Sequence, residues 1–161
     1  MMPWLNSLRD RVRVAIDAVS RKCFRRNRLL GESDTLSVGK QGERIAADYL
    51  RRQGLKILHQ SYRSPIGEVD IIALDQSNRS RKTLVFVEVK TWRIPAQGGP
   101  ADAVDGQKQE RLTRLALEFL KRHRLLESPA RFDVVQVILE PLSIRHFPNA
   151  FEATGKYQWF S

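Results

Sequence analysis

The chain has 161 residues, of which 42% are hydrophobic, and this fits one main domain that buries its own core. The single cysteine, Cys23, excludes an internal disulfide and a cysteine-based zinc site, while charges interrupt every apolar run, so we expect neither a signal peptide nor a membrane span. The 28 Lys and Arg residues outnumber the 18 Asp and Glu residues, and the net charge of +10 favours a polyanionic partner such as nucleic acid. We therefore expect a soluble protein of the reducing cytoplasm.

Residues 1–35 form a predicted basic amphipathic extension and linker, set apart from a main domain over residues 36–161. Apolar residues recur at helical spacing between Trp4 and Val19, and a cluster of Arg and Lys follows between Arg21 and Arg28. Such a helix suits an anionic membrane surface or nucleic acid. A helix that packs on its own domain or frays is the favoured interpretation, and contact with a membrane or nucleic acid stays open.

The main domain is predicted to alternate helices and strands in a fixed order. A helix over residues 39–54 has Ser37 as N-cap and Gly54 as its stop signal, and a second helix runs from Gly106 to Arg124. Four segments rich in β-branched and aliphatic residues read as strands, at residues 55–63, 67–75, 83–92 and 131–140. Residues 143–151 are expected to be a tail, and Gly98 to Pro100 a mobile loop or a plain connector. The order α-β-β-β-α-β predicts an α/β fold with a mixed sheet flanked by helices.

The strands at 67–75 and 83–92 are predicted to pair as a hairpin whose loop is centred on Arg79. Opposing residue numbers then sum to 158, which places Asp70 opposite Glu88. Strand alternation puts Asp70 on one face with Glu88 and Lys90. The opposite face is predicted to be aliphatic core; its members are Val69, Ile71, Ala73, Val85, Val87 and Val89.

Two opposed carboxylates repel each other unless a proton or a cation lies between them. A site with oxygen ligands only favours Mg²⁺ or Mn²⁺, and Mg²⁺ typically takes one or two protein carboxylates. Asp70 and Glu88 are therefore predicted to hold such an ion. Lys90 follows on the same face, where its ammonium could orient a water molecule and stabilise a transferring phosphate.

Two more charged residues fall on the apolar stripes of the predicted helices. Glu43 shares a face with Ala46 and Leu50, and Lys108 precedes Leu112 on the second helix. Taken singly, such charges often extend to solvent or pair with each other. A shared network with Asp70, Glu88 and Lys90 would satisfy both of them at once.

The aromatic residues and histidines carry weaker signals. Trp92 and Tyr62 could stack on unpaired bases, although core packing or exposure at the rim is the favoured interpretation of both. The three histidines lack metal-ligand spacing and are predicted to be packing or surface residues; they are His59, His123 and His146. The sequence has no P-loop and no dinucleotide-binding glycine pattern, so no small-molecule cofactor is expected.

At the acidic motifs the chain resembles the PD-(D/E)XK nuclease superfamily, through "GEVDII" followed by "FVEVK". From Gly39 to about Phe151 it resembles the YraN family of small bacterial proteins, through "GKQGERIAADYL", "LVFVEVKTW", "AVDGQKQERL" and "RFDVVQV". The resemblance implies a restriction-endonuclease-like core related to Holliday-junction resolvases. It implies a catalytic trio of Asp70, Glu88 and Lys90, with Glu43 as the acidic helix residue and Lys108 as a basic residue of the second helix.

Three positions depart from the family pattern. Ser61 stands where the family usually has Asn, and Trp92 stands where it usually has Arg. The proline that precedes the Asp in the superfamily is displaced, since Pro65 lies five residues before Asp70. These changes spare the expected metal ligands Asp70, Glu88 and Glu43. They bear instead on phosphate contacts, which we expect from a separate set of residues: Lys108, Arg63, Trp92 and Arg93.

The sequence thus predicts a Mg²⁺- or Mn²⁺-dependent endonuclease that acts on DNA in preference to RNA, with branched or damaged DNA as the expected substrate. Symmetric cutting of a four-way junction would require a homodimer. Two alternatives remain, namely a nucleic-acid-binding module that does not cut and an adaptor tethered to a membrane or partner through residues 1–35.

Overall fold

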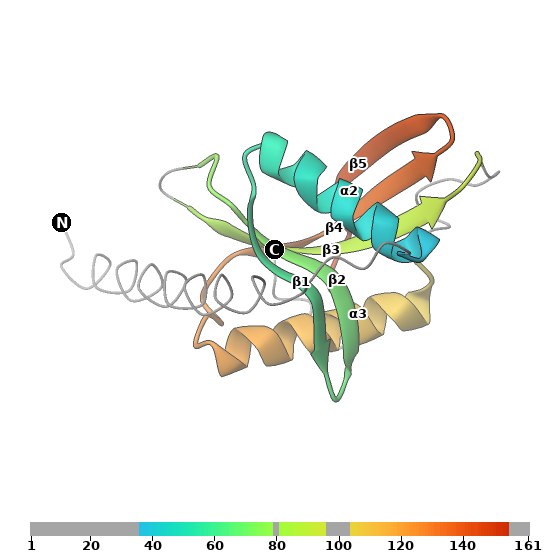
Figure 1. Ribbon diagram of the computed structural model, residues 1–161. Coiled ribbons are helices and arrows are strands. Elements are labelled where there is room, and N and C mark those ends of the chain that lie inside the picture. The colour runs from blue at the N-terminus through green and yellow to red at the C-terminus, as the bar shows by residue number, and fades with distance from the viewer. Residues whose placement is uncertain (1–35, 79–80, 96–103, 155–161) are drawn as a thin grey trace.

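The computed structural model describes residues 36–78, 81–95 and 104–154, so the predicted extension over residues 1–35 and the loop at 98–100 lie outside the described residues. Two helices and five strands make up this part of the chain (Figure 1). In chain order they are α2 (Val38–Arg52), β1 (Lys56–Ser64), β2 (Gly67–Asp75), β3 (Thr83–Trp92), α3 (Gly106–Arg122), β4 (Ala130–Leu139) and β5 (Leu142–Phe151). The predicted α/β class with a mixed sheet is confirmed, and the architecture is consistent with a restriction-endonuclease-like fold.

The five strands form one sheet in the order β1-β2-β3-β4-β5. The pairs β1–β2, β2–β3 and β4–β5 are antiparallel, whereas β3 and β4 are parallel. Parallel neighbours need a crossover connection, and α3 supplies it between β3 and β4. The carboxyl end of β3 carries Glu88 and Lys90. It therefore lies at the same end of the sheet as the start of α3.

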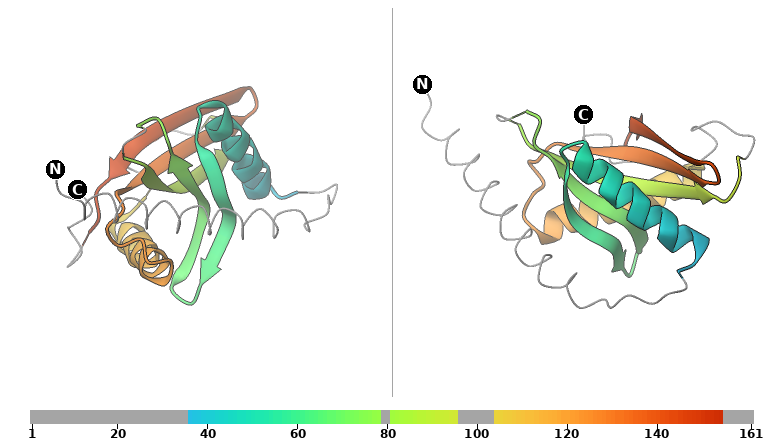
Figure 2. Two further views of the ribbon diagram at one scale, coloured as in Figure 1. Left: turned by 90° about the vertical axis from the view of Figure 1, so that its left-hand side faces the viewer. Right: turned by 45° about the horizontal axis from the view of Figure 1, so that its top comes forward.

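The helices cover opposite faces of the sheet, so each face has its own hydrophobic core (Figures 1 and 2). The core on the α3 side includes Leu112, Leu115 and Phe119 of the helix with Ile72, Leu84, Phe86 and Phe132 of the sheet. The core on the α2 side is built from Ala46, Ala47 and Leu50 with Ile71, Ala73, Val85, Val87, Val135 and Val137. The central strands are therefore apolar on both faces, as buried strands in α/β folds usually are.

The helix boundaries follow local capping chemistry. The Ser37 hydroxyl accepts from the backbone N–H of Lys40 at 3.4 Å, and Gly54 after α2 has a φ of 88°, which glycine adopts without steric cost. At α3 the Asp105 carboxylate accepts from the backbone N–H of Lys108 at 2.8 Å. The predicted start of α3 is confirmed, and its end lies two residues earlier than predicted, since Arg124 adopts a left-handed φ of 58°.

The predicted tail at residues 143–151 was wrong, because these residues belong to β5. This strand pairs with β4 from Phe132↔Phe151 to Leu139↔Leu142. It lies at the edge of the sheet and most of its residues are exposed or half-buried, so its sequence lacks a strong apolar alternation. Pro148 is tolerated there because an edge strand leaves some N–H groups without a ladder partner.

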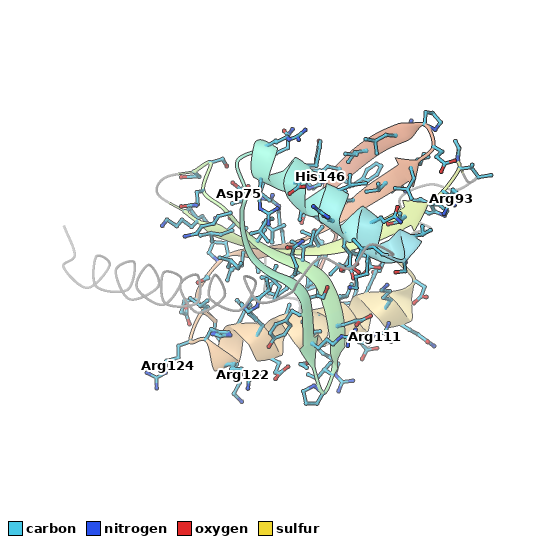
Figure 3. All side chains as sticks on the ribbon, viewed as in Figure 1. Asp75, Arg93, Arg111, Arg122, Arg124 and His146 are labelled. Carbon is cyan, nitrogen blue, oxygen red and sulfur yellow. The ribbon has the colours of Figure 1, made fainter. Side chains whose placement is uncertain are left out.

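A buried ionic group, which we call the Asp133 cluster, joins β2, β4 and β5 on the α2 side. Asp133 is fully buried; Arg131 donates to both of its carboxylate oxygens, at 3.0 and 3.2 Å, and also to Asp75 at 2.7 Å. His146 Nε2 lies 2.9 Å from Asp133, and Figure 3 shows His146 and Asp75 on the α2 side of the sheet. Burial would raise the pKa of Asp133, but hydrogen bonds from His146 and Arg131 hold it below its ordinary value.

The remaining histidines pack against one aromatic residue of α3. The ring centroids of His59 and His123 lie 5.7 and 4.4 Å from that of Phe119. The prediction of a packing role therefore holds for His59 and His123, whereas His146 is a member of the Asp133 cluster. Tyr62 packs against Phe119 as well, at 5.3 Å, which favours the core reading of this residue over base stacking.

Candidate active site

The register of the β2–β3 hairpin is the one predicted from its loop. The paired residues run from Ile71↔Val87 to Asp75↔Thr83, and their numbers sum to 158 throughout. Asp70 and Glu88 follow directly after the pair Ile71↔Val87. The two acids therefore meet at the point where the regular hairpin pairing ends.

The predicted alternation of β2 breaks at Asp70. Val69, which was predicted to share the face of Ile71, packs instead in the core on the α3 side, next to its β1 partner Tyr62. The cause lies in β1, where Ser61 has a left-handed φ of 49° between the paired residues Gln60 and Tyr62. The pairing register is the same on both sides of Ser61, with Gln60↔Ile71 and Tyr62↔Val69, so Asp70 lies opposite Ser61 at the boundary between the two faces.

Asp70 takes the place of a strand partner for β3. Its Oδ2 accepts the backbone N–H of Val89 at 2.7 Å, so the carboxylate replaces a carbonyl where the paired stretch ends. Burial and the nearby charge of Glu88 raise the pKa of Asp70 to about 7, against the lowering effect of the Val89 hydrogen bond. Glu43 raises this pKa further and Lys108 lowers it, so residues from both helices act on Asp70.

Glu88 is a buried acid held between two lysines. Its side chain is 5% exposed, and its Oε1 accepts from Lys108 Nζ of α3 and lies 3.3 Å from Lys90 Nζ. Partial burial would lower the pKa of Lys108, but the hydrogen bond and charge of Glu88 raise it above its ordinary value, so this ammonium group is charged at neutral pH. The structure therefore brings together four of the predicted site residues: Asp70, Glu88, Lys90 and Lys108.

Glu43 approaches the same place from α2, on the other face of the sheet. Lys40 Nζ donates to Glu43 Oε1 and Oε2 at 2.8 and 2.7 Å, and the Ser61 hydroxyl donates to Oε2 at 2.8 Å. The inward direction predicted for Glu43 is confirmed, since its side chain is 16% exposed. The negative charge of Glu43 raises the pKa of Asp70, whereas the hydrogen bonds of Glu43 go to Lys40 and Ser61.

Sequence reasoning missed Lys40 and Ser61 as members of this site. Lys40 precedes Glu43 by three residues, a spacing at which side chains on a helix meet. That spacing is a usable but weak signal, because most such pairs lie on exposed helix surfaces. Ser61 gave a signal only as a departure from the family's usual Asn, a residue that adopts left-handed backbone more readily than most.

The carboxylate oxygens of Asp70 and Glu88 suit an ion such as Mg²⁺, although these two side chains alone would not enclose it. Among the residues that the structure describes, no three His, Cys, Asp or Glu side chains gather closely enough to enclose a metal. Mg²⁺ uses one or two carboxylates and completes its octahedron with water and phosphate, so Asp70 and Glu88 meet its need. Burial raises the pKa of Asp70 most and the charge of Glu88 raises it further, and a cation beside the two carboxylates would offset their mutual repulsion.

The predicted nucleic-acid contacts divide into two groups. Lys108 lies inside the site through its contact with Glu88. Arg63 and Arg93 are exposed and are paired with Glu68 and Glu140, at 3.2 and 3.0 Å, and Figure 3 shows Arg93 at the end of β3. Trp92 is the last residue of β3 and is half-buried. Within the part of the chain that the structure describes, Arg63 and Arg93 thus form their ion pairs with Glu68 and Glu140 and not with the acids of the site.

Comparison with known proteins identifies a family. The model of the uncharacterised protein family UPF0102 matches residues 42–137. A UPF0102 protein of Syntrophotalea carbinolica is 45% identical over 74% of this chain and 95% of its own length. UPF0102 proteins of Rhodopirellula baltica and Trichlorobacter lovleyi are 43% and 45% identical, over 76% and 77% of this chain and 74% and 96% of their own lengths. The matched region contains Glu43, Asp70, Glu88, Lys90 and Lys108.

Proposed function

The chain belongs to the UPF0102 family, the YraN family that its motifs resemble, and from the geometry at Asp70 and Glu88 we propose that it is a Mg²⁺- or Mn²⁺-dependent endonuclease. Its proposed reaction is hydrolysis of phosphodiester bonds in DNA, with branched or damaged DNA as the substrate. The cytoplasm is its proposed location. Among the described residues, no helix combines the length and apolarity needed to cross a membrane.

One observation carries the proposal, namely the pairing of a buried glutamate with a second acid that titrates near neutrality. Glu88 is 5% exposed and lies between two ammonium groups, while its charge helps to raise the pKa of Asp70 to about 7. A protein that only binds DNA gains nothing from acids clustered near phosphates, because they repel the substrate. A divalent cation would turn this repulsion into attraction for a phosphate group.

Asp70 and Glu88 would hold the ion, and Glu43 would support it or a second ion. A bound Mg²⁺ or Mn²⁺ supplies Lewis-acid stabilisation of the charge that develops on the phosphate. Lys90 Nζ, 3.3 Å from Glu88 and 28% exposed as a side chain, would orient the attacking water as a hydrogen-bond donor and stabilise negative charge, and the proton of the water would pass to solvent. Lys108, at the start of α3, would stabilise negative charge on the transferring phosphate.

The nucleic acid would contact Lys108, Arg63, Trp92 and Arg93. Arg63 and Arg93 are exposed and their ion pairs are on the surface, where such pairs contribute little stability and exchange readily for phosphate. Cutting both strands of a four-way junction symmetrically requires two active sites. We therefore propose that such a substrate would be cut by a homodimer.

The proposal is tested with forked, flapped and four-way DNAs incubated with Mn²⁺. We expect cleavage by the wild-type protein and a loss of about 10²- to 10³-fold in Lys90→Met, the range typical for loss of one group that stabilises charge in the transition state. Glu88→Gln should lose cleavage as well. Strand cutting is measured on labelled DNA by denaturing gel electrophoresis.

Two control variants match these changes outside the site. Glu127→Gln removes an exposed acid that follows α3, and Lys56→Met removes an exposed lysine at the start of β1. Both should cut at the wild-type rate. Cleavage that survives Lys90→Met and Glu88→Gln would remove these residues from the mechanism, and DNA binding without any cleavage would favour the non-catalytic binding module.

A further inference from the structure

Lys40 is a cation of the site to which the proposed reaction gives no role. It lies in the first turn of α2, and its Nζ contacts three oxygens within 2.8 Å, namely both carboxylate oxygens of Glu43 and the Ser61 hydroxyl. Its side chain is 42% exposed, so an approaching ligand can reach it. Both oxygens with which Glu43 could bind a metal are therefore engaged by one accessible ammonium group.

Ser61 fixes this arrangement through an unusual backbone conformation. Its φ of 49° lies in the left-handed region, which few residues other than glycine adopt, and such residues tend to persist at functional sites. The conformation directs the Ser61 hydroxyl toward α2, where it accepts from Lys40 and donates to Glu43, each at 2.8 Å. The same hydroxyl thus sets the positions of the ammonium group and of the carboxylate.

An ammonium group and a divalent cation cannot use the same carboxylate oxygens at full strength. If Glu43 supports an ion, as proposed above, the contact from Lys40 must weaken when that ion binds. The displaced ammonium, whose side chain is 42% exposed, would then be open to an anion that approaches from solvent, and the anion of the proposed substrate is a phosphate. Its three donors and compact charge suit a phosphate oxygen.

We propose that Lys40 is an exchangeable cation that holds Glu43 until a divalent ion takes this carboxylate and then binds a phosphate of the nucleic acid. This inference rests on the proposed function and extends it to a residue with no assigned role. It couples metal binding to substrate binding through a single side chain. Ser61 is the positioning residue of the exchange.

The exchange makes two predictions of opposite sign for Lys40→Met. Removing the competing ammonium should tighten Mn²⁺ binding about two- to fivefold, the range expected for loss of a partly exposed ion pair. It should also weaken DNA binding in Ca²⁺, another ion that takes oxygen ligands, and lower the slope of log affinity against log salt by about one. In EDTA no divalent ion displaces Lys40 from Glu43. The slopes of log affinity against log salt should then agree between variant and wild type.

The measurements are calorimetric titration with Mn²⁺ and fluorescence anisotropy of labelled DNA at several salt concentrations. Lys56→Met is the matched control, because it removes the same charge from an exposed lysine outside the Lys40, Glu43 and Ser61 contacts, and its Mn²⁺ affinity should equal that of the wild type. Thermal unfolding of each variant checks that the fold is intact. A Lys40→Met variant that binds Mn²⁺ no more tightly than Lys56→Met would overturn the exchange, and so would an unchanged salt slope in Ca²⁺.

Failure of the exchange and failure of the proposed function give different results. If the wild-type protein takes up no Mn²⁺, the metal site itself is refuted, and the exchange falls with it. If the wild type binds Mn²⁺ through Asp70 and Glu88 while Lys40→Met leaves both affinities unchanged, only the exchange is refuted. Weaker binding of both Mn²⁺ and DNA in a folded Lys40→Met variant would instead assign Lys40 a structural role.

Discussion

At the residue scale, the site depends on where Asp70 lies relative to its neighbours. Burial and the charge of Glu88 raise its pKa to about 7, although the backbone N–H of Val89 opposes them. A proton therefore occupies this carboxylate for much of the time at neutral pH. A cation that binds Asp70 must displace that proton, so the two compete.

This competition predicts the pH dependence of metal binding. Below pH 7 the folded protein holds the Asp70 proton, so Mn²⁺ affinity should fall by up to about tenfold for each pH unit and level off above pH 8. Asp70→Asn should bind Mn²⁺ weakly and lose this dependence. Calorimetric titrations between pH 6 and pH 8 measure the effect, and a wild-type affinity that stays flat over this range would contradict it.

The residues that sequence reasoning missed depend on tertiary contacts. Asp70 and Glu88 could be predicted because the hairpin loop fixes their register, and Lys108 because it falls on an apolar helix stripe. Lys40 and Ser61 could not be predicted, because their role arises from a left-handed residue in β1 that meets the first turn of α2. The sequence shows the spacing of residues along each element, but it does not show that β1 and α2 make contact at these residues.

At the element scale, α2 reaches the site because one glycine lets it approach β3 closely. A side-chain carbon added at Gly42 would come within 1.7 Å of the Thr91 hydroxyl, so the helix packs directly on that strand. Gly42 is one residue before Glu43. The close approach therefore sets how near Glu43 lies to the sheet.

A pair of substitutions on the same helix tests this packing. Gly42→Ala should destabilise the protein by about 1–3 kcal/mol, the usual range for overpacking a tight contact, and should displace Glu43. Gly39→Ala meets no atom within 4 Å and should be neutral or stabilising by up to about 1 kcal/mol, because alanine favours the helix. Denaturant unfolding measures both, and equal stabilities of the two variants would contradict the account.

The elements differ in how far their sequences predict them. The predicted strand segments at 67–75 and 83–92 match β2 and β3, because aliphatic runs between polar loops leave little choice. The edge strand β5 was missed, since a half-exposed strand does not need a regular apolar pattern. The face of Val69 was also missed, because the irregularity at Ser61 changes the alternation of β2 without a sequence signal.

At the scale of the whole molecule, the Asp133 cluster holds β2, β4 and β5 together away from the proposed chemistry. Its stabilising contribution depends on pH. Burial would raise the pKa of Asp75, but the Ser77 N–H and the Arg131 guanidinium lower it to about 2 from an ordinary value of 3.8. Folding therefore gains stability from the ionised carboxylate above about pH 3.8, and loses this gain as the pH falls through about 2.

Acid unfolding tests the cluster as a unit. We expect the wild-type protein to lose stability between about pH 4 and pH 2, and Asp75→Asn to be less stable at pH 7 but to depend less on pH in this range. Asp48→Asn is the matched control, because it removes an exposed acid that pairs with Arg51 on the surface. Urea unfolding at fixed pH values gives both curves, and parallel curves for wild type and Asp75→Asn would exclude this role.

The most direct test of the account is calorimetric titration of the wild-type protein and of Glu88→Gln with Mn²⁺ at pH 8. We predict that the wild type binds Mn²⁺ through Asp70 and Glu88, that Glu127→Gln binds it equally well, and that Glu88→Gln loses at least about tenfold in affinity. Equal Mn²⁺ binding by wild type and Glu88→Gln, or no binding by either, would contradict the claim that these two acids form a metal site.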